Sequence, residues 1–485
     1  MAIVIEQKPK YKLLPVGQQI IHTVYDATVI GGSNFKIKYI AEIYVSNVSA
    51  SIMSTANRVA VVKVNPNNTG RGIFDLNPIL ENYVSPDYEG GFINQADQAN
   101  MSTYNTNAYS SATPHNIHQI DNFTTNKNSV RYVRIKFKVE FATSATGAVT
   151  VNSGNEQDSD KLLIFNGMLY ETDVLNLDSS NNFGYNLDYY NFILRNSNGT
   201  FLSNAPTTQY LRDTDYLTLP FFTEIDYSET GITEVGTSSA TNPAIKFVKF
   251  QFYYNGSTTG SLISKQVNAA NGGHYGYQTE ANNRIQYVGA GTGNLVGSGE
   301  TLPANWDYYT VEAYDDTDTV VSATYKLYKQ DEDCKGYETI RLTWLNKWGT
   351  WDYYNFTKKS IRKINTKRKT FTQITGTWNE SVFRLNGHQG GNKTYNSSIT
   401  ESITLNTDYI SEANAIWLEE LFISNEVYKI NKRSTDDSGQ GYMRKYIEPV
   451  VLKTSTHTRK TKANDRLIQY TFEIETTKTK KSQRI

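Results

Sequence analysis

Hydrophobic and polar residues alternate along several segments of this chain. In residues 133–141 the apolar and the charged side chains fall on opposite faces of an extended strand. A period of two with one apolar face is typical of a half-buried strand in an antiparallel sheet. The same alternation recurs in residues 35–45, 246–254 and 466–474. Strands are therefore expected from one end of the chain to the other.

Turn residues separate these strands. Asn255 and Gly256 follow an aromatic strand, and both tolerate the positive φ angles of a two-residue hairpin. The sequence Asp-Asp-Thr-Asp at 315–318 lies between two further strand-like segments, 308–314 and 320–328, and predicts a second hairpin. This combination favours antiparallel β-sandwich units.

Only two segments predict helices. Residues 77–84 have Asn77 as a possible N-cap and Pro78 at the first helical position. Residues 411–422 have Ser411 as a possible N-cap and an acidic residue in the first turn. The apolar stripe of this second helix is expected at Ala413, Trp417 and Leu421. Both helices are short enough to cover the ends or faces of sheets.

Long stretches without periodicity lie at residues 85–129 and 255–305, and we expect polar loops there. Loops of this length are unusual inside a compact enzyme but suit a protein that makes contacts outside its own domain. No repeat of fixed period is present. The predicted fold is mainly β: tandem antiparallel β-sandwich-like units with a few short helices. The predicted domains are 1–160, β-rich; 161–332, a β-sandwich-like domain with long loops; and 333–485, β-rich with one amphipathic helix and a basic strand.

The overall charge narrows the classes of partner. The 485 residues include 48 Lys+Arg and 48 Asp+Glu, so the formal net charge is zero. This argues against a dedicated partner of nucleic acid or of an anionic membrane, because both require a basic surface. No segment approaches the roughly 18 apolar residues of a membrane-spanning helix, and no membrane contact is expected. Aromatic residues, at 13%, supply burial that disordered chains lack.

Cys334 is the single cysteine. It excludes an intramolecular disulfide and a multi-cysteine zinc site, which fits folding in a reducing compartment. The first residues lack a basic region followed by a long apolar stretch, so no signal peptide is expected.

Few residue patterns could carry chemistry. His115 and His118 have a spacing that could hold a metal, but no acidic or cysteine partner lies nearby, which favours solvated loop histidines. The acidic residues 315–318 lack the glycine and the closing glutamate of a calcium loop, which favours a turn. The glycine-rich residues 289–299 follow no evident strand leading into a helix, and no Lys-Ser/Thr pair comes after them. They predict a flexible loop rather than a nucleotide site.

Catalytic constellations are not recognisable. There is no Gly-x-Ser-x-Gly motif, and Cys334 follows acidic residues that disfavour a reactive thiolate. Glycoside hydrolysis needs two facing carboxylates, but 48 acidic residues offer such pairs without specificity. We therefore predict no catalytic, cofactor-binding or metal-binding residues, no cofactor, and a protein that is not an enzyme.

The main charge asymmetry consists of two basic runs, at residues 358–369 and 478–484. The favoured interpretation is an edge strand protected by its charges, or a surface that meets an acidic neighbouring subunit. Contact with DNA or RNA is the less favoured alternative, because aligned Lys and Arg can neutralise phosphates.

Residues 341–356 read Arg-Leu-Thr-Trp-Leu-Asn-Lys-Trp-Gly-Thr-Trp-Asp-Tyr-Tyr-Asn-Phe. This block resembles one in virion structural proteins of tailed bacteriophages of Bacteroidetes hosts, including crAss-like phages, where a basic strand follows it. Later segments resemble the family's Trp-Leu-Glu-Glu-Leu-Phe helix, its x-Pro-Val strand and its closing strand; they are residues 417–422, 448–451 and 467–475. Residues 35–45 and 72–80 are similar to the start of such proteins.

The resemblance implies a structural component of a virion, a tail, neck or baseplate ring subunit that acts through self-assembly and subunit contacts. The expected partners are copies of itself in a ring-like homo-oligomer and other tail, neck or portal-proximal proteins. The expected location is the virion, after assembly in the host cytoplasm.

The aromatic residues of the block are expected to be partly core and partly subunit interface, since Tyr and Trp are favoured at interfaces; they are Trp344, Trp348, Trp351, Tyr353 and Tyr354. The alternative function is a carbohydrate-binding or depolymerising tail protein for host-surface glycans. A third interpretation is an intracellular β-rich adaptor.

Overall fold

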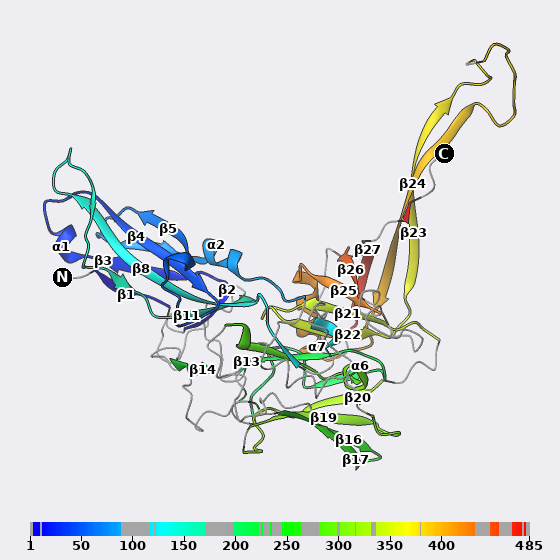
Figure 1. Cartoon of the computed structure of the whole chain (residues 1–485). Coiled ribbons are helices and arrows are strands. Elements are labelled where there is room, and N and C mark those ends of the chain that lie inside the picture. The colour runs from blue at the N-terminus through cyan, green and yellow to red at the C-terminus, as the bar shows by residue number, and fades with distance from the viewer. Residues whose placement is uncertain are drawn as a thin grey trace. The chain divides into compact units, whose positions relative to one another are not determined.

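The computed structural model describes residues 3–9, 12–88, 117–120, 123–169, 192, 194, 197–222, 225–226, 233–234, 245, 247–263, 281–297, 301–315, 317–330, 336–378, 380–431, 447–454, 468–477 and 480–481. Mostly antiparallel sheets with a few short helices form the structure, which confirms the predicted mainly-β class (Figure 1). The chain divides into two compact units. Unit 1 contains Met1–Gln330 and Leu345–Asp352, and unit 2 contains Asp331–Trp344 and Tyr353–Ile485.

A seven-stranded sheet forms the first part of unit 1. Its main path has the order β2-β11-β8-β4-β5, and two short strands, β9 and β10, also pair with β8. The strands are β2 (Leu13–Gly17), β4 (Phe35–Ser46), β5 (Arg58–Val64), β8 (Val130–Ala142), β9 (Thr150–Val151), β10 (Gln157–Asp158) and β11 (Leu162–Met168). The strands predicted at 35–45 and 133–141 are thus confirmed as β4 and β8.

Strand β8 shows how the alternation works. Val133, Ile135, Phe137 and Val139 are all buried, whereas the basic residues between them are partly exposed. Burial of this apolar face removes it from water and holds β8 at the centre of the sheet. The alternation ends after Val139, since Phe141 is partly exposed and Ala142 is buried.

Strand β11 pairs in parallel with β2 and antiparallel with β8. Its residues follow the predicted domain boundary at 160, whereas β2 and β8 precede it. The sheet therefore extends across that boundary, because β11 completes it between the two earlier strands.

A three-stranded sheet, β1-β3-β6, accompanies the larger one. Its elements and the short helices around it are β1 (Val4–Gln7), β3 (Ile21–Tyr25), α1 (Ala27–Ile30), η1 (Thr55–Asn57), β6 (Gly72–Asp75), α2 (Asn77–Leu80) and η2 (Glu81–Tyr83). Helix α2 confirms the prediction at 77–84 only in part. The N-cap is Leu76 rather than Asn77, and the Asp75 carboxylate accepts a hydrogen bond from the Asn77 backbone N–H at 3.2 Å.

The rest of unit 1 contains a five-stranded sheet of order β12-β20-β19-β16-β17. The strands are β12 (Thr208–Leu211), β16 (Phe247–Tyr254), β17 (Ser257–Ile263), β19 (Tyr308–Tyr314) and β20 (Tyr325–Lys329). Asn255 and Gly256, with φ angles of 49° and 76°, form the predicted two-residue turn between β16 and β17. Asp315 forms the second predicted turn, where its carboxylate accepts hydrogen bonds from the backbone N–H groups of Thr317 and Thr319.

Two smaller sheets complete unit 1: β13-β18-β7 and β14-β15. Their strands and the neighbouring helices are η3 (Ile117–Gln119), β7 (Phe123–Thr125), β13 (Thr218–Phe222), β14 (Ile225–Asp226), β15 (Thr233–Glu234), η5 (Ala281–Asn283), β18 (Ile285–Gly289) and α6 (Thr292–Gly297). The expectation of loops throughout residues 255–305 was therefore wrong, because β17, β18 and α6 lie in this range.

Most of unit 2 is an eight-stranded sheet of order β22-β21-β25-β26-β27-β24-β23, with β28 paired to β24. The strands are β21 (Ile340–Leu345), β22 (Trp351–Phe356), β23 (Ile361–Gln373), β24 (Gly391–Asn406), β25 (Val427–Ile430), β26 (Ile447–Leu452), β27 (Thr471–Thr476) and β28 (Lys480–Lys481).

Helix α7 (Glu412–Ile423) packs within unit 2. The Ser411 hydroxyl accepts a hydrogen bond from the Asn414 N–H at 3.3 Å, which confirms the predicted N-cap. The Trp417 ring lies 5.2 Å from that of Trp344. Ala413 is exposed, contrary to the predicted stripe, and the buried apolar residues are Ala415, Trp417, Leu418 and Leu421.

A candidate interaction arm

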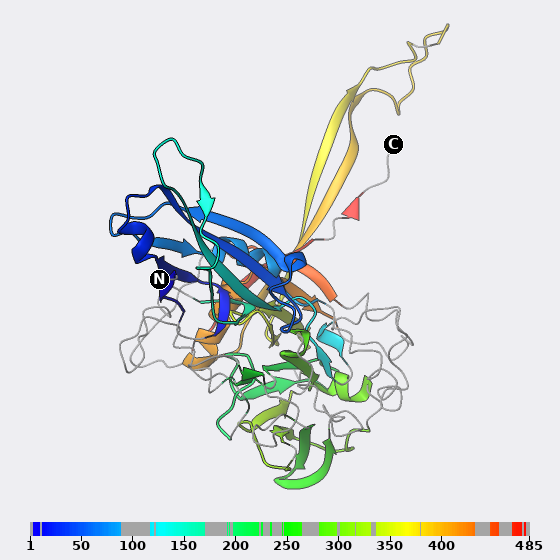
Figure 2. The same cartoon turned by 60° about the vertical axis from the view of Figure 1, so that its left-hand side comes forward.

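Strands β23 and β24 form a long two-stranded ribbon, which we call the arm (residues 361–406). They pair from Ile361 with Thr404 to Gln373 with Gly391. Strand β27 pairs with β24 only over residues 402–406, and β28 pairs with it at Ser398 and Ile399. Both views show the ribbon, in yellow, extending beyond the remaining strands of its own unit (Figures 1 and 2). We call residues 361–373 and 391–406 the stem and residues 374–390 the tip.

The stem buries side chains only near its base, at Ser402, Ile403 and Leu405 of β24. Every residue of β23 except Gln373 is exposed. A two-stranded ribbon by itself is marginally stable in water, because it has no third layer against which to bury side chains. A long ribbon with both faces open is therefore a structure suited to being covered by another molecule.

The tip holds a group of exposed apolar side chains. The Trp378 side chain is 72% exposed, and its ring lies 5.2 Å from that of Phe383, which is 55% exposed. The other exposed apolar residues of the tip are Ile374, Val382 and Leu385. Exposed apolar groups of this kind mark contact surfaces when they lie together. Sequence reasoning missed them, although large apolar residues inside a glycine-flanked turn after a basic strand would have been a usable signal.

Hydrogen bonds within the tip give this loop a definite shape. The Trp378 indole N–H donates to the Thr375 carbonyl at 2.8 Å. The Thr377 hydroxyl donates to the Val382 carbonyl at 3.0 Å and accepts from the Arg384 N–H at 2.8 Å. The apolar side chains are therefore presented by a folded turn.

Basic residues line the stem. Lys363, Lys367 and Lys369 share one face of β23, because alternate residues of a strand point the same way. Arg368 lies on the other face, and Lys393 lies on β24. None of these five cations has a carboxylate within 4 Å among the described residues. Arg362, at the base, pairs with Glu338 at 2.6 Å and Glu401 at 2.8 Å.

Part of the second basic run, residues 478–484, pairs with the stem. Residues 480–481 form β28, in which Lys481 is the register partner of Ser398 and Lys480 that of Ile399. The structure therefore brings part of the C-terminal basic run beside the stem. The rest of that run lies outside the described residues.

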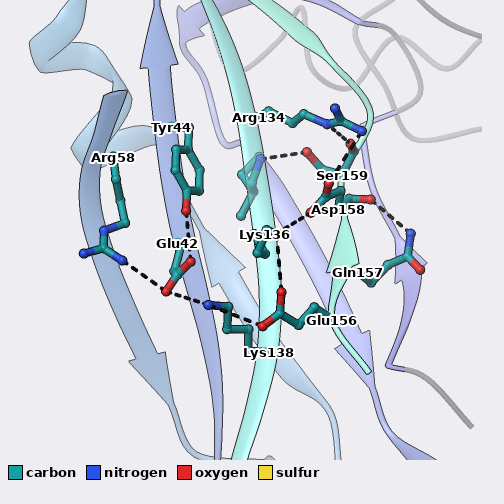
Figure 3. Close-up of polar contacts among 11 residues, drawn as sticks. Glu42, Tyr44, Arg58, Arg134, Lys136, Lys138, Glu156, Gln157, Asp158 and Ser159 are labelled. Atoms are coloured by element: carbon teal, nitrogen blue, oxygen red, sulfur yellow. Dashed lines mark hydrogen bonds and ion pairs between the residues drawn. The ribbon is translucent and has the colours of Figure 1, made fainter. Parts of the chain in front are cut away.

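The partly exposed cations of β8 in unit 1, unlike those of the stem, have carboxylate partners (Figure 3). The Lys138 ammonium lies 2.9 Å from Glu42, which also contacts Arg58 at 3.4 Å and accepts a hydrogen bond from the Tyr44 hydroxyl at 3.0 Å. Burial would raise the pKa of Glu42, but the hydrogen bonds from Lys138 and Tyr44 together lower it. Burial would lower the pKa of Lys138, and its bond to Glu42 raises it.

Strand β10 and Glu156, the residue before it, supply further anions to the cations of β8. Lys136 lies 3.3 Å from Glu156 and 3.8 Å from Asp158, and Asp158 also lies 3.8 Å from Arg134. Cations on β8 are thus neutralised by the neighbouring strands, as Figure 3 shows. This network is internal to the sheet, whereas the charges of the stem remain open to a partner.

The aromatic block is core rather than interface in its central residues. Trp344 and Trp351 are almost fully buried, and Trp348 and Tyr353 are buried as well. The Trp351 indole N–H donates to the Asp87 carbonyl at 2.8 Å, and the Trp348 indole N–H donates to Asn204 at 3.2 Å. The expected subunit interface is therefore not available at these residues, since their own chain already covers them.

The loop of this block depends on two residues. The Asn346 carboxamide oxygen accepts hydrogen bonds from the backbone N–H groups of Trp348 and Thr350, at 3.0 and 3.1 Å. Gly349 has a φ of 74°, and a Cβ atom there would lie 1.6 Å from the Asn166 carbonyl oxygen. The Leu-Asn-x-x-Gly pattern is thus explained by turn geometry and close backbone packing.

The glycine-rich segment is structured, so the predicted flexible loop was wrong. Strand β18 leads directly into α6, and Asn294 donates to the Ile120 carbonyl at 2.7 Å while accepting from the Leu217 N–H at 2.8 Å. A Cβ atom on Gly289 would lie 2.2 Å from the Ile120 oxygen, and one on Gly291 would lie 2.4 Å from the Asp215 oxygen. These glycines permit close packing of backbone segments.

Histidine positions also differ from expectation. His118 is buried and its ring lies 4.6 Å from that of Trp351, so it is not a solvated loop residue. His115 lies outside the described residues, as do residues 331–335 with Cys334.

No group of three His, Cys, Asp or Glu side chains in the described parts of the chain is placed to hold a metal ion. Nor is any helix there long and apolar enough to cross a membrane.

Four tyrosines form a row across the five-stranded sheet. Tyr210, Tyr328, Tyr308 and Tyr253 are successive register partners, and their ring centroids are 5.8, 5.1 and 4.7 Å apart. Tyr253 and Tyr308 are almost parallel, with an interplanar angle of 9°. At this spacing the inner rings cover one another's faces. The row therefore stabilises the sheet through cross-strand pairs.

Comparisons with known proteins assign no family. No family model matches the chain, and no curated protein matches it. Among solved structures, trypsin-activated alpha-2-macroglobulin from Escherichia coli matches with a TM-score of 0.19 and 8% identity, over 83% of this chain and 22% of that one. A Salmonella alpha-2-macroglobulin mutant gives 0.17 and 7%, over 97% and 22%. Dimeric latent PorU from Porphyromonas gingivalis gives 0.17 and 8%, over 83% and 32%.

The chain therefore spans less than a third of the length of each of these proteins. The TM-scores are too low to support an argument about fold or function.

Proposed function

We propose that this protein is a structural, non-enzymatic component of a bacteriophage virion, a tail, neck or baseplate ring subunit that acts through contacts between copies. Its other partners would be neighbouring tail, neck or portal-proximal proteins. It would assemble in the host cytoplasm and remain in the virion. The resemblance of residues 341–356 and the segments after them to phage structural proteins supports this proposal.

The observation that carries the proposal is the apolar tip of the arm. Five large apolar residues, each more than half exposed, lie on a turn that is itself folded by hydrogen bonds. Exposing them to water is unfavourable, and their burial against another subunit would recover roughly 25 cal/mol per Å² of apolar surface. Trp378 would be the anchor, since buried tryptophans dominate the binding energy of many interfaces.

The test is the assembly state of the full-length protein. We expect the wild type to form a ring or other closed oligomer, measured by sedimentation velocity and negative-stain microscopy. The double variant Trp378→Ser/Phe383→Ser should weaken assembly at least about 30-fold, as expected for the loss of a hot spot worth about 2 kcal/mol or more.

The matched control is Tyr409→Ser/Ile416→Ser, which removes two exposed apolar side chains of unit 2 outside the arm. It should assemble as the wild type does. A wild type that stays monomeric under assembly conditions and is absent from purified particles by mass spectrometry would contradict the proposal.

A further inference from the structure

The stem of the arm carries a row of cations that assembly through the tip does not require. We propose that the stem binds the phosphate backbone of double-stranded DNA, with the two-stranded ribbon seated in a groove of the duplex. This inference goes beyond the proposed function and does not depend on it, because it rests on different residues.

The first argument is uncompensated charge. Lys363, Lys367, Arg368, Lys369 and Lys393 have no carboxylate within 4 Å among the described residues, whereas the β8 cations Lys136 and Lys138 each contact two. The β8 cations are only partly exposed, whereas those of β23 are exposed. Arg58 and Lys63 on β5 are exposed as well, yet each has a carboxylate partner, so exposure alone does not explain the difference. An open row of cations attracts a polyanion and releases its condensed counterions.

The second argument is the chemistry between the cations. Residues 363–378 and 391–400 contain no Asp or Glu, and their remaining polar residues are mainly Asn, Ser and Thr. Together with Lys and Arg, these side chains supply most of the hydrogen bonds that proteins make to DNA phosphates. On the face that carries Lys367 and Lys369, the cross-strand partners are Ser398 and Asn396.

The third argument is shape. Two strands lie about 4.8 Å apart, and the major groove, about 12 Å wide, admits a two-stranded ribbon. The ribbon carries cations on both faces, with Lys367 on one and Arg368 on the other. This arrangement suits a groove, which has phosphates on two walls. A flat acidic protein surface would meet only one face. Strand β28 adds Lys480 and Lys481 at register positions beside the stem.

The experiment uses fluorescence anisotropy of the full-length protein with a labelled 24-base-pair duplex of arbitrary sequence. Five phosphate contacts predict that log K falls against log salt with a slope of about −4.5, or about 500-fold weaker binding between 50 and 200 mM salt. The variant Lys367→Gln/Lys369→Gln should reduce the steepness of that slope by about 2 and weaken binding at 50 mM salt.

The matched control, Arg58→Gln/Lys63→Gln, removes the same charge from exposed strand residues that already have carboxylate partners. It should bind the duplex as the wild type does. An equal loss in the control, an unchanged slope in the stem variant, or no duplex binding by the wild type at 50 mM salt would overturn the proposal. So would self-association that depends on the stem lysines without any DNA binding, which would assign the stem to a second copy.

The tip variant Trp378→Ser/Phe383→Ser separates this inference from the proposed function. It should lose assembly and keep the salt slope of the wild type. Loss of DNA binding in that variant, with assembly intact, would also contradict the assignment of the stem.

Discussion

One of the buried histidines of unit 1, His22, predicts a defined acid sensitivity. His22 lies on β3, is 1% exposed, and has its ring 5.6 Å from that of Phe137. Burial, and then the charge of Lys12, lower the pKa of His22 from 6.5 to about 4, whereas Asp160, which contacts Lys12, acts in the opposite direction. The native state therefore holds this imidazole neutral where the unfolded chain would protonate it.

The size of the effect on the free energy of unfolding follows from the linkage between proton binding and folding. A difference of about 2.5 pH units between the unfolded and the folded pKa corresponds to about 3 kcal/mol. Because the folded pKa is the lower one, the unfolded state binds more protons between pH 6.5 and about 4. The contribution to stability is complete above pH 6.5 and is lost as the pH falls through that window.

The assay compares wild type and His22→Phe by urea unfolding at several pH values between 7.5 and 4. Phenylalanine keeps an aromatic ring beside Phe137 but cannot be protonated. Between pH 7 and 4, the wild type should lose about 3 kcal/mol more free energy of unfolding than the variant. Substitution of the exposed His388 by Gln serves as the control and should leave the wild-type pH profile unchanged.

Parallel pH profiles for wild type and His22→Phe would refute this reasoning. They would mean that His22 is protonated as easily in the folded protein as in the unfolded chain. An equal change in the His388→Gln control would likewise show that the effect does not come from burial at His22.

Two further predictions concern backbone geometry and capping. Gly349→Ala should lower the free energy of unfolding in urea by at least about 2 kcal/mol, because the backbone there is left-handed and an added Cβ would meet the Asn166 oxygen. Gly154→Ala, where φ is 90° and the surrounding space is open, should lower it less. Equal losses in the two variants would contradict the packing argument. Ser411→Ala should lower the stability of unit 2 by about 1 kcal/mol through loss of the α7 N-cap, whereas no change in its thermal unfolding would show that this cap contributes nothing.

Local rules explain where sequence reasoning succeeded. The period of two predicted β8 and β16 because each strand buries one face, and it also predicted β4, although β4 is buried on both faces from Tyr39 to Ser46. Asn255-Gly256 predicted its turn because both residues adopt positive φ angles. The Ser411 cap was predicted for the same kind of reason, since a cap involves groups only three residues apart. These features depend on neighbours in the chain.

Contacts distant in sequence explain where it failed. From the sequence, Gly289 and Gly291 predicted a flexible loop. The backbone carbonyls that pack against them, those of Ile120 and Asp215, are distant in the chain, so a local pattern could not indicate these contacts. Trp351 read as a possible interface because the Asp87 carbonyl that accepts its indole N–H is 264 residues away.

In the arm, too, some features follow from the sequence of the segment and others from contacts distant in the chain. The sequence by itself determined that residues 358–369 would be basic and largely extended, with few acidic neighbours. The predicted edge strand is confirmed, since β23 is the last strand of its sheet. Only the tertiary structure decided that the paired stem reaches beyond β27 and that Trp378 and Phe383 meet at its tip. Charge and periodicity are properties of a segment, whereas an uncovered edge or an unpaired cation depends on which other segments pack beside it.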